Sequence, residues 1–283
     1  MVIELRSLGK LIAECWIKAE RATAKLIDEK YHSPNEENIT FLFSAELRTS
    51  VREASDSARV TNAFLADLRQ AVHHLTSADL REYSDLIARV NFHNRQHEGR
   101  ESASDLGIVV KRPQLRLESS RIRLNFEFAT GMLAQAKLGR SSNSIQGKYN
   151  WGQLTAAQRR LFRKRRDYYS LLLYRLSGTN SNQLTDFGWQ LCKGYTVRKV
   201  QEWLGSGAFP EELCSAELMR QLFADRIGTR NPTTIETIID PDAPPSQTIE
   251  LQVFWPKDRT PPPSYHLKSP IQGSQRLSLH QQI

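Results

Sequence analysis

Three polar residues in the middle of the chain have types and spacings that could support chemistry. Asp105 stands at the mouth of the short apolar run DLGIVV, where a carboxylate is costly unless it is paired or binds a cation. Gln135 and Lys137 lie two residues apart in GMLAQAKLG, so on a strand both project from one face, while Ala134 and Ala136 face the other way. If the two strands pair, a carboxylate, an amide and an ammonium converge on one cleft edge.

The elements expected to carry these residues follow one another along the chain. DLGIVV is short and rich in β-branched residues, which is typical of a buried strand. RIRLNFEFA alternates apolar and polar residues, and the strand is predicted to continue through TGMLAQAKLG with a bulge or turn at Gly131. Upstream, Ser33-Pro34-Asn35-Glu36 has the pattern of a capping box, which predicts a helix from Pro34. Glu37 lies in its first turns, one turn from Phe41.

This order of a helix glutamate, a strand aspartate and a strand with Q-x-K resembles the PD-(D/E)XK superfamily of restriction-endonuclease-like nucleases. The resemblance covers roughly residues 34–176. It implies that Asp105, Glu37 and Gln135 bind Mg²⁺, or Mn²⁺ in its place, and that Lys137 orients or activates the attacking water. These four are the predicted catalytic residues. Glu36 is explained by the capping box, yet either it or Glu37 could face the site.

The sequence departs from the family pattern at two places. Gln135 replaces the usual acidic residue, and Ser102-Ala103-Ser104 replaces the usual proline- or glycine-rich lead to the aspartate. The Q-x-K variant is similar to that of type IV restriction enzymes and several phage-defence nucleases, in which glutamine serves as a neutral oxygen ligand. Losing one negative charge weakens the expected metal affinity, or removes it.

The implied chemistry explains these residue types. Hydrolysis of a phosphodiester develops charge on the nonbridging and leaving oxygens, and a hard cation held by oxygen ligands offsets that charge. Mg²⁺ keeps several waters and needs only one or two protein carboxylates, so Asp105 and Glu37 suffice. Gln135 or the carbonyl of Ala136 would add a further oxygen.

A strongly basic helix is predicted over about residues 154–167. Six of the eight residues 159–166 are Arg or Lys, and six like charges in so short a run favour contact with a polyanion. In the resembled family, a helix at this place carries a glutamine that faces the site, followed by cations along the nucleic-acid backbone. The residues that take these roles are Gln158, Arg159, Arg160, Arg163, Lys164 and Arg166. Such phosphate contacts are salt-sensitive and mostly independent of sequence.

The remaining patterns predict a helical start, a central domain and a tail. Apolar spacing predicts helices over 3–29, 61–75, 78–92, 194–205 and 211–226, and YYSLLLYRL has the pattern of a central strand. From Gly228 the chain becomes proline-rich, and only QTIELQVFW within that part has a strand pattern. The expected domains are an N-terminal helix (1–33), a nuclease-like domain (34–227) and a proline-rich extension (228–283) outside the catalytic fold.

Composition excludes several other classes of protein. Lys and Arg exceed Asp and Glu by 39 to 31, which gives a net charge of +8 and favours polyanionic partners. Three widely spaced cysteines argue against a disulfide scaffold or a cysteine zinc site and favour a reducing cytoplasm. His93 and His97 have helical metal spacing but no third ligand, and Glu101 is best explained as a surface residue. No apolar run or leader predicts contact with a membrane.

The sequence therefore predicts an α/β protein with a restriction-endonuclease-like mixed central sheet flanked by helices and a helical N-terminal region. The predicted activity is Mg²⁺-dependent cleavage of DNA, with RNA as the other nucleic acid considered, in restriction or antiviral defence in the cytoplasm. Because no P-loop is present, control by a partner protein or a homo-oligomer is expected. The alternatives are a nuclease-fold binding subunit without catalysis, favoured by Gln135, and a helical interaction protein with a basic patch.

Overall fold

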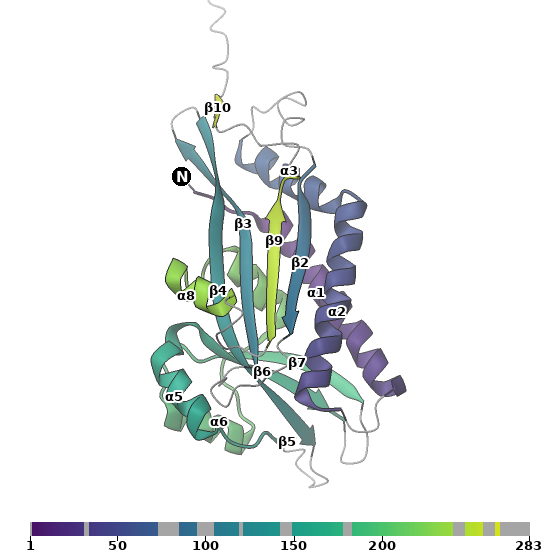
Figure 1. Ribbon diagram of the computed structural model, residues 1–283, viewed down its shortest axis with the longest axis vertical. Helices are drawn as coiled ribbons and strands as arrows, with labels where there is room; N and C mark the ends of the chain where they lie inside the picture. The colour runs from purple at the N-terminus through teal and green to yellow at the C-terminus, as the bar shows by residue number, and fades with distance from the viewer. Residues whose placement is uncertain are drawn as a thin grey trace, which may run out of the picture.

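The computed structural model describes residues 2–30, 34–72, 85–94, 105–118, 121–141, 149–177, 183–239, 247–256 and 264–266. Within these ranges the protein is an α/β structure with one mixed sheet between helices (Figure 1). The helices are α1 (Arg6–Lys30), α2 (Glu36–Asp56), α3 (Arg59–Ala71), α5 (Ala156–Arg165), α6 (Val197–Ser206), α7 (Ser215–Phe223) and α8 (Pro232–Ile239), with a 3₁₀ turn at Arg166–Tyr168.

The sheet contains ten strands in the described ranges, and seven of them follow one another in the order β2-β9-β3-β4-β6-β7-β8. These are β2 (Ile87–Asn94), β9 (Gln247–Phe254), β3 (Leu106–Glu118), β4 (Arg121–Ser141), β6 (Tyr169–Leu176), β7 (Leu184–Leu191) and β8 (Glu212–Cys214). The short strands β1 (Val2–Ile3), β5 (Tyr149–Asn150) and β10 (Ser264–His266) pair at the ends of β3 and β4. β9 runs parallel to β3 and β6 runs parallel to β4, whereas β3 and β4 are antiparallel.

Alternating side chains of the strands pack into two hydrophobic cores, one on each face of the sheet. Leu106, Ile108 and Ala134 point to the face covered by α1, α2, α3 and α7. Val109 and Leu133 point to the opposite face, against α5, α6 and α8. Because both faces are covered, the polar side chains of the inner strands are forced into apolar surroundings unless they lie at a strand end.

The hairpin of β3 and β4 is the longest element of the sheet. Its register shifts between Arg112 and Gln114, at Pro113, which has no N–H to give to the ladder. At Gly131 the register is unbroken, so the predicted bulge or turn there is wrong. A Cβ at Gly131 would lie 2.9 Å from the Cδ1 of Ile238, so the close approach of α8 accounts for the glycine.

Three further sequence predictions are corrected by the structure. The helix predicted over 78–92 is wrong over its described part, because residues from Ile87 form β2, in which Ala88 and Val90 alternate inward. The helix predicted from Pro34 begins at Glu36, capped by the side chain of Asn35; Ser33 lies outside the described residues. The boundary predicted at 228 does not match the sheet, because β9 pairs with both β2 and β3.

The helical start, the strand runs 106–110 and 121–138, the helix near 154–167 and the central strand β6 are confirmed. So are the two helical patterns near 194–205 and 211–226, as α6 and α7. QTIELQVFW forms a strand as its alternation predicts, although its position inside the sheet was unforeseen.

Candidate functional site

The candidate site lies where β3 begins, and among the described residues no strand pairs with residues 135–139 of β4 on the β3 side. The pairing of β3 with β4 starts at Leu106 opposite Ala134, whereas β4 continues to Ser141. On its other side β4 stays paired with β6 through Arg140. The free stretch of β4 therefore presents backbone N–H groups at alternate residues, roughly 7 Å apart. We call residues 135–139 on this side the β4 edge.

Asp105 satisfies the first of these N–H groups. Its Oδ2 accepts a hydrogen bond from the backbone N–H of Ala136 at 2.9 Å and a second from the Nε2 of Gln135. Its own carbonyl accepts from the N–H of Gln247 at 3.1 Å, so β9 fixes the backbone of Asp105. The aspartate that the sequence singles out is thus anchored from both neighbouring strands.

Glu36 satisfies the second group. Its Oε1 accepts the backbone N–H of Leu138 at 2.7 Å. Burial raises the pKa of this carboxyl, although the N–H of Leu138 and the charge of Lys137 act in the opposite direction. Asp105 and Glu36 therefore stand side by side along the β4 edge, two residues apart in its register.

Gln135 has a buried side-chain oxygen without a hydrogen-bond partner among the described residues. The residue is 1% exposed, and its Nε2 is engaged by Asp105. Its Oε1 is buried and has no hydrogen-bond partner within the described residues. A buried amide oxygen without a partner costs free energy. The Oε1 of Gln135 is therefore available to accept a hydrogen bond or to coordinate a cation beside the Asp105 carboxylate.

Lys137 lies two residues further along the same face of β4 as Gln135. It is 8% exposed, which is unusual for a lysine, and its charge acts on Glu36. Leu173 is its partner on β6 and belongs to the core beneath α5 and α6. The Lys137 ammonium is therefore held largely out of water and close enough to Glu36 for its charge to act on that carboxyl.

Two residues that sequence reasoning missed fix α2 over this edge. The Oγ1 of Thr40 lies 2.7 Å from the phenolic oxygen of Tyr174, and Tyr174 is the partner of Leu138 across β4 and β6. Burial raises the pKa of Tyr174, the bond to Thr40 lowers it, and the nearby charges of Asp105 and Glu36 raise it further. The phenol thus stays neutral and orients the first turn of α2, which carries Glu36. The run YYSLLLYRL gives no sign of this role.

The structure brings Gln135 into contact with Asp105, and it places Glu36 rather than Glu37 on the backbone of Leu138, where the charge of Lys137 acts on it. Glu37, which we predicted, is exposed. The change follows from the cap: Asn35 accepts the N–H of Asn38, so Glu36 is not needed for a capping box and can reach β4.

The basic helix is confirmed as α5, with a different use of its first residues. Gln158 forms a capping box with Thr155, in which its Oε1 accepts the N–H of Thr155 at 2.9 Å, so the expectation that it faces the site is corrected. Arg159 donates to the carbonyl of Leu154 at 3.1 Å. The exposed cations of this helix and the turn that follows are Arg160, Arg163, Lys164 and Arg166.

Other candidate metal ligands gain no support. Among the described residues, no group of three or more His, Cys, Asp and Glu side chains is arranged to hold a metal ion. At the β4 edge two carboxylates and the amide oxygen of Gln135 are the candidate ligands. His93 lies in strand β2, so the helical spacing to His97 does not apply; His97 and Glu101 lie outside the described residues.

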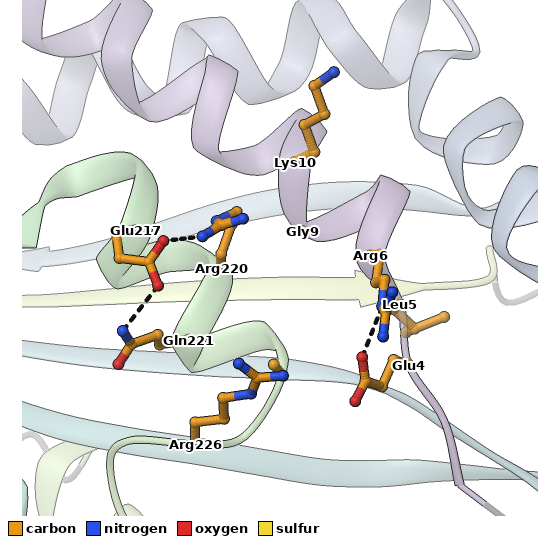
Figure 2. A pocket seen from close by; sticks show the side chains of 10 residues that line it. Glu4, Leu5, Arg6, Gly9, Lys10, Glu217, Arg220, Gln221 and Arg226 are labelled. Atoms are coloured by element: carbon orange, nitrogen blue, oxygen red, sulfur yellow. Dashed lines mark hydrogen bonds and ion pairs between the residues drawn. The ribbon is translucent and has the colours of Figure 1, made fainter.

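A charged hollow of about 430 Å³ lies between the start of α1 and the end of α7 (Figure 2). In it Arg6 pairs with Glu4 at 2.8 Å, and Arg220 pairs with Glu217. Glu217 also accepts from Gln221 at 2.8 Å. Arg6 and Arg220 are thus paired with carboxylates, and the hollow shares no lining residue with the β4 edge.

Comparison of the chain with protein-family models, with curated proteins and with solved structures finds no match. None of the described helices has the length and apolar character needed to cross a membrane. The function must therefore be argued from the site.

Proposed function

We propose that the protein is a metal-dependent nuclease of the PD-(D/E)XK type that hydrolyses phosphodiester bonds of DNA. The observation that carries the proposal is the β4 edge, where two carboxylates, an unpartnered amide oxygen and a lysine gather at one strand end. The chain order of α2, β3, β4 and α5 is also the order in which the family places its helix glutamate, strand aspartate, x-x-K strand and basic helix.

The donor set fits a hard divalent cation. Asp105, Glu36 and Gln135 all offer oxygen, the ligand atom that Mg²⁺ and Mn²⁺ take, and two carboxylates are enough for Mg²⁺. The buried Oε1 of Gln135 without a partner is the specific sign, since a bound cation would satisfy it. These three residues would hold the ion, and its positive charge would offset the charge that develops on the phosphate oxygens.

The remaining steps fall to the chain's own groups. Lys137, held almost out of water, stabilises negative charge on the phosphate and favours the deprotonated form of an attacking water. Thr40 and Tyr174 keep Glu36 in place. The exposed arginines of α5 supply phosphate contacts that position the nucleic acid without reading its sequence. Restriction or antiviral defence in the cytoplasm is the biological role that the resemblance suggests.

A binding subunit without catalysis is the second candidate, and one observation favours it. Gln135 is neutral, and its amide N–H already donates a hydrogen bond to Asp105. That hydrogen bond stabilises the Asp105 carboxylate without a cation. The helical interaction protein is no longer supported, because β3 and β4 pair along Leu106–Glu118 and Arg121–Ala134.

The deciding test is incubation of plasmid DNA, and separately RNA, with the purified protein in Mg²⁺, Mn²⁺ or EDTA. We expect cleavage that depends on the divalent ion and is lost in Asp105→Asn, which keeps an oxygen for the N–H of Ala136. The matched control is Asp167→Asn, an exposed aspartate after α5, which should cleave like the wild type. DNA binding with no cleavage in either ion would favour the binding subunit.

A further inference from the structure

A second feature lies between the C-terminal half of α2 and the outer strand of the sheet. The groove between them has a volume of about 790 Å³ and is lined by α2 residues and by Ile87–Phe92 of β2. Figure 1 shows α2 alongside β2 over most of the length of both elements. We call it the α2–β2 groove.

The groove is positively charged. Arg48 and Arg52, one turn apart on α2, and Arg89 of β2 line it, against the single carboxylate of Asp56. Arg48 and Arg52 are exposed, and no ion pair joins any of the three arginines to the described residues. The guanidinium of Arg89 lies over the ring of Phe254, at 5.4 Å from its centroid. Phe254 lines a hollow with Ile235 of α8, on the sheet face opposite α2. The Arg89 side chain is therefore turned away from Arg48 and Arg52. The lining by Arg48 and Arg52 complements a polyanion.

An exposed aromatic side chain stands at the end of the groove nearest the site. Phe41 is 47% exposed, and among the described residues it is the only large hydrophobic side chain that is exposed. Its ring contacts that of Phe92 edge to face, with centroids 5.8 Å apart. Phe41 therefore presents a supported ring to solvent, which is the arrangement on which an unpaired base can stack.

The groove leads to the β4 edge. Phe41 lies five residues after Glu36, roughly 7–8 Å along α2. Asn94 at the end of β2 is the partner of Gln247, and Gln247 is the partner of Leu106, so two strand spacings, roughly 10 Å, separate β2 from Asp105. Ser55 bonds the N–H and carbonyl of Ala88, so α2 closes the outer edge of β2 at the far end of the groove.

We propose that the α2–β2 groove binds single-stranded nucleic acid, with a base stacked on Phe41, phosphates at Arg48 and Arg52, and the strand leading to the β4 edge. A single strand fits better than a duplex because the groove lies between one helix and one β-strand. An exposed ring can also stack on an unpaired base, whereas the bases of a duplex are stacked on one another. The inference rests on the proposed function for the nature of the ligand. The substrate would then be a single-stranded region, an overhang or a flap.

The test measures binding without cleavage. Fluorescence anisotropy with a labelled oligothymidylate in EDTA compares the wild type, Phe41→Ala, and the double variant Arg48→Glu/Arg52→Glu. The matched control is Arg21→Glu/Lys25→Glu, which makes the same charge change at two exposed positions one turn apart on α1. We expect the groove double variant to bind at least about tenfold more weakly and with a lower salt slope. Phe41→Ala should lose about fivefold or more, and the control should match the wild type.

The outcomes separate the inference from the proposed function. Because EDTA removes the divalent ion, failure to cleave DNA in the earlier assay leaves this binding result intact. Wild-type binding by both groove variants would overturn the inference. So would equal affinity for a duplex of the same length with the same loss in Phe41→Ala, since a duplex offers no base to that ring. Sedimentation must also show an unchanged mass; a wild-type dimer that the groove variants dissociate would identify the groove as an interface between copies and overturn the inference.

Discussion

The β4 edge and helix α5 carry the two kinds of charge in this protein, and they differ in how the fold treats them. At the β4 edge Gln135 and Lys137 are buried and the two carboxylates are half-buried. Each carboxylate is held by a backbone N–H, Asp105 by that of Ala136 and Glu36 by that of Leu138. On α5 the cations of residues 160–166 are mostly exposed, and Arg159 and Gln158 are used by the helix itself. A buried polar cluster costs free energy to maintain, which points to a function, whereas exposed arginines are stable in water whether or not they contact a polyanion.

The comparison predicts that single changes matter at the β4 edge and that only combined changes matter on α5. The largest effect should come from Lys137→Ala. Loss of its charge should lower the cleavage rate by about 10²–10³-fold, because a fixed cation beside the reacting phosphate stabilises the charge of the transition state. A steady-state cleavage assay measures this, together with a thermal melt that shows the variant folded.

Lys111→Ala is the matched control for that change, since Lys111 is also a strand lysine but pairs with Glu250 at 2.8 Å. It should cleave like the wild type. Equal rates for Lys137→Ala and the wild type, with contaminating nuclease excluded, would remove Lys137 from the mechanism.

The next largest effect is expected from substitutions of Gln135, which change the oxygen offered to the metal ion. Gln135→Ala removes that oxygen and should weaken the affinity for Mg²⁺ by about 10- to 100-fold, as loss of a metal-orienting group does. Gln135→Glu keeps the size and adds a charge, so cleavage should persist at a lower Mg²⁺ concentration. The dependence of rate on Mg²⁺ measures both. An unchanged requirement in Gln135→Ala would show that the oxygen does not serve the ion.

The α5 arginines should show a smaller and additive effect. Neutralising Arg160, Arg163 and Arg166 should weaken DNA binding for all sequences and lower the slope of log affinity against log salt by about one unit for each lost phosphate contact. Arg159→Ala is the internal control, because that side chain bonds the Leu154 carbonyl, and it should change the slope least. A slope equal to that of the wild type in the triple variant would mean that α5 faces away from DNA.

The smallest expected effect is on the stability of the fold, through the half-buried carboxyl of Glu20. Burial raises the pKa of Glu20 to about 8, against the hydrogen bond from Ser215. The folded state therefore binds a proton that the unfolded state has lost, and this contribution to stability is present below about pH 4.5 and is lost as the pH rises through 8. Because the side chain is partly exposed, Glu20→Gln should raise the unfolding free energy at pH 9 by only about 1 kcal/mol, or roughly 2–4 °C in Tm.

Melts of the wild type and Glu20→Gln at pH 5, 7 and 9 check this, and the difference should shrink toward pH 5. A difference that is constant over this range would show that Glu20 does not titrate as its burial predicts.

Local patterns predicted the parts of the site that lie on one strand. Gln135 and Lys137 share a face because residues two apart on any strand do, and Asp105 stood out as a carboxylate beside an apolar run. Glu37 was chosen over Glu36 because the capping box was assigned to Ser33; the cap at Asn35 moves the first turn by one residue and changes which side chain reaches β4. A shift of one residue at the start of the helix is enough to change which glutamate is the candidate metal ligand.

Non-local pairing accounts for the rest. Leu86, Ile87 and Val90 fit a helical spacing as well as a strand, and the choice is made by pairing with β9, which is more than 150 residues away along the chain. The same strand was expected in a tail, although it holds the backbone of Asp105 through Gln247. The alternation of one segment does not say which partner it finds, so the position of β9 in the sheet could not be predicted.

The central claim is that the β4 edge holds a cation through Glu36, and one pair of neighbouring variants tests it most directly. Mn²⁺ binding to the wild type, Glu36→Gln and Glu37→Gln can be followed by electron paramagnetic resonance. Both variants lose the same charge from the same turn of α2. We predict a saturable site in the wild type that is weakened by about tenfold or more in Glu36→Gln and is unchanged in Glu37→Gln. No saturable Mn²⁺ binding, or equal affinity in all three proteins, would contradict the account.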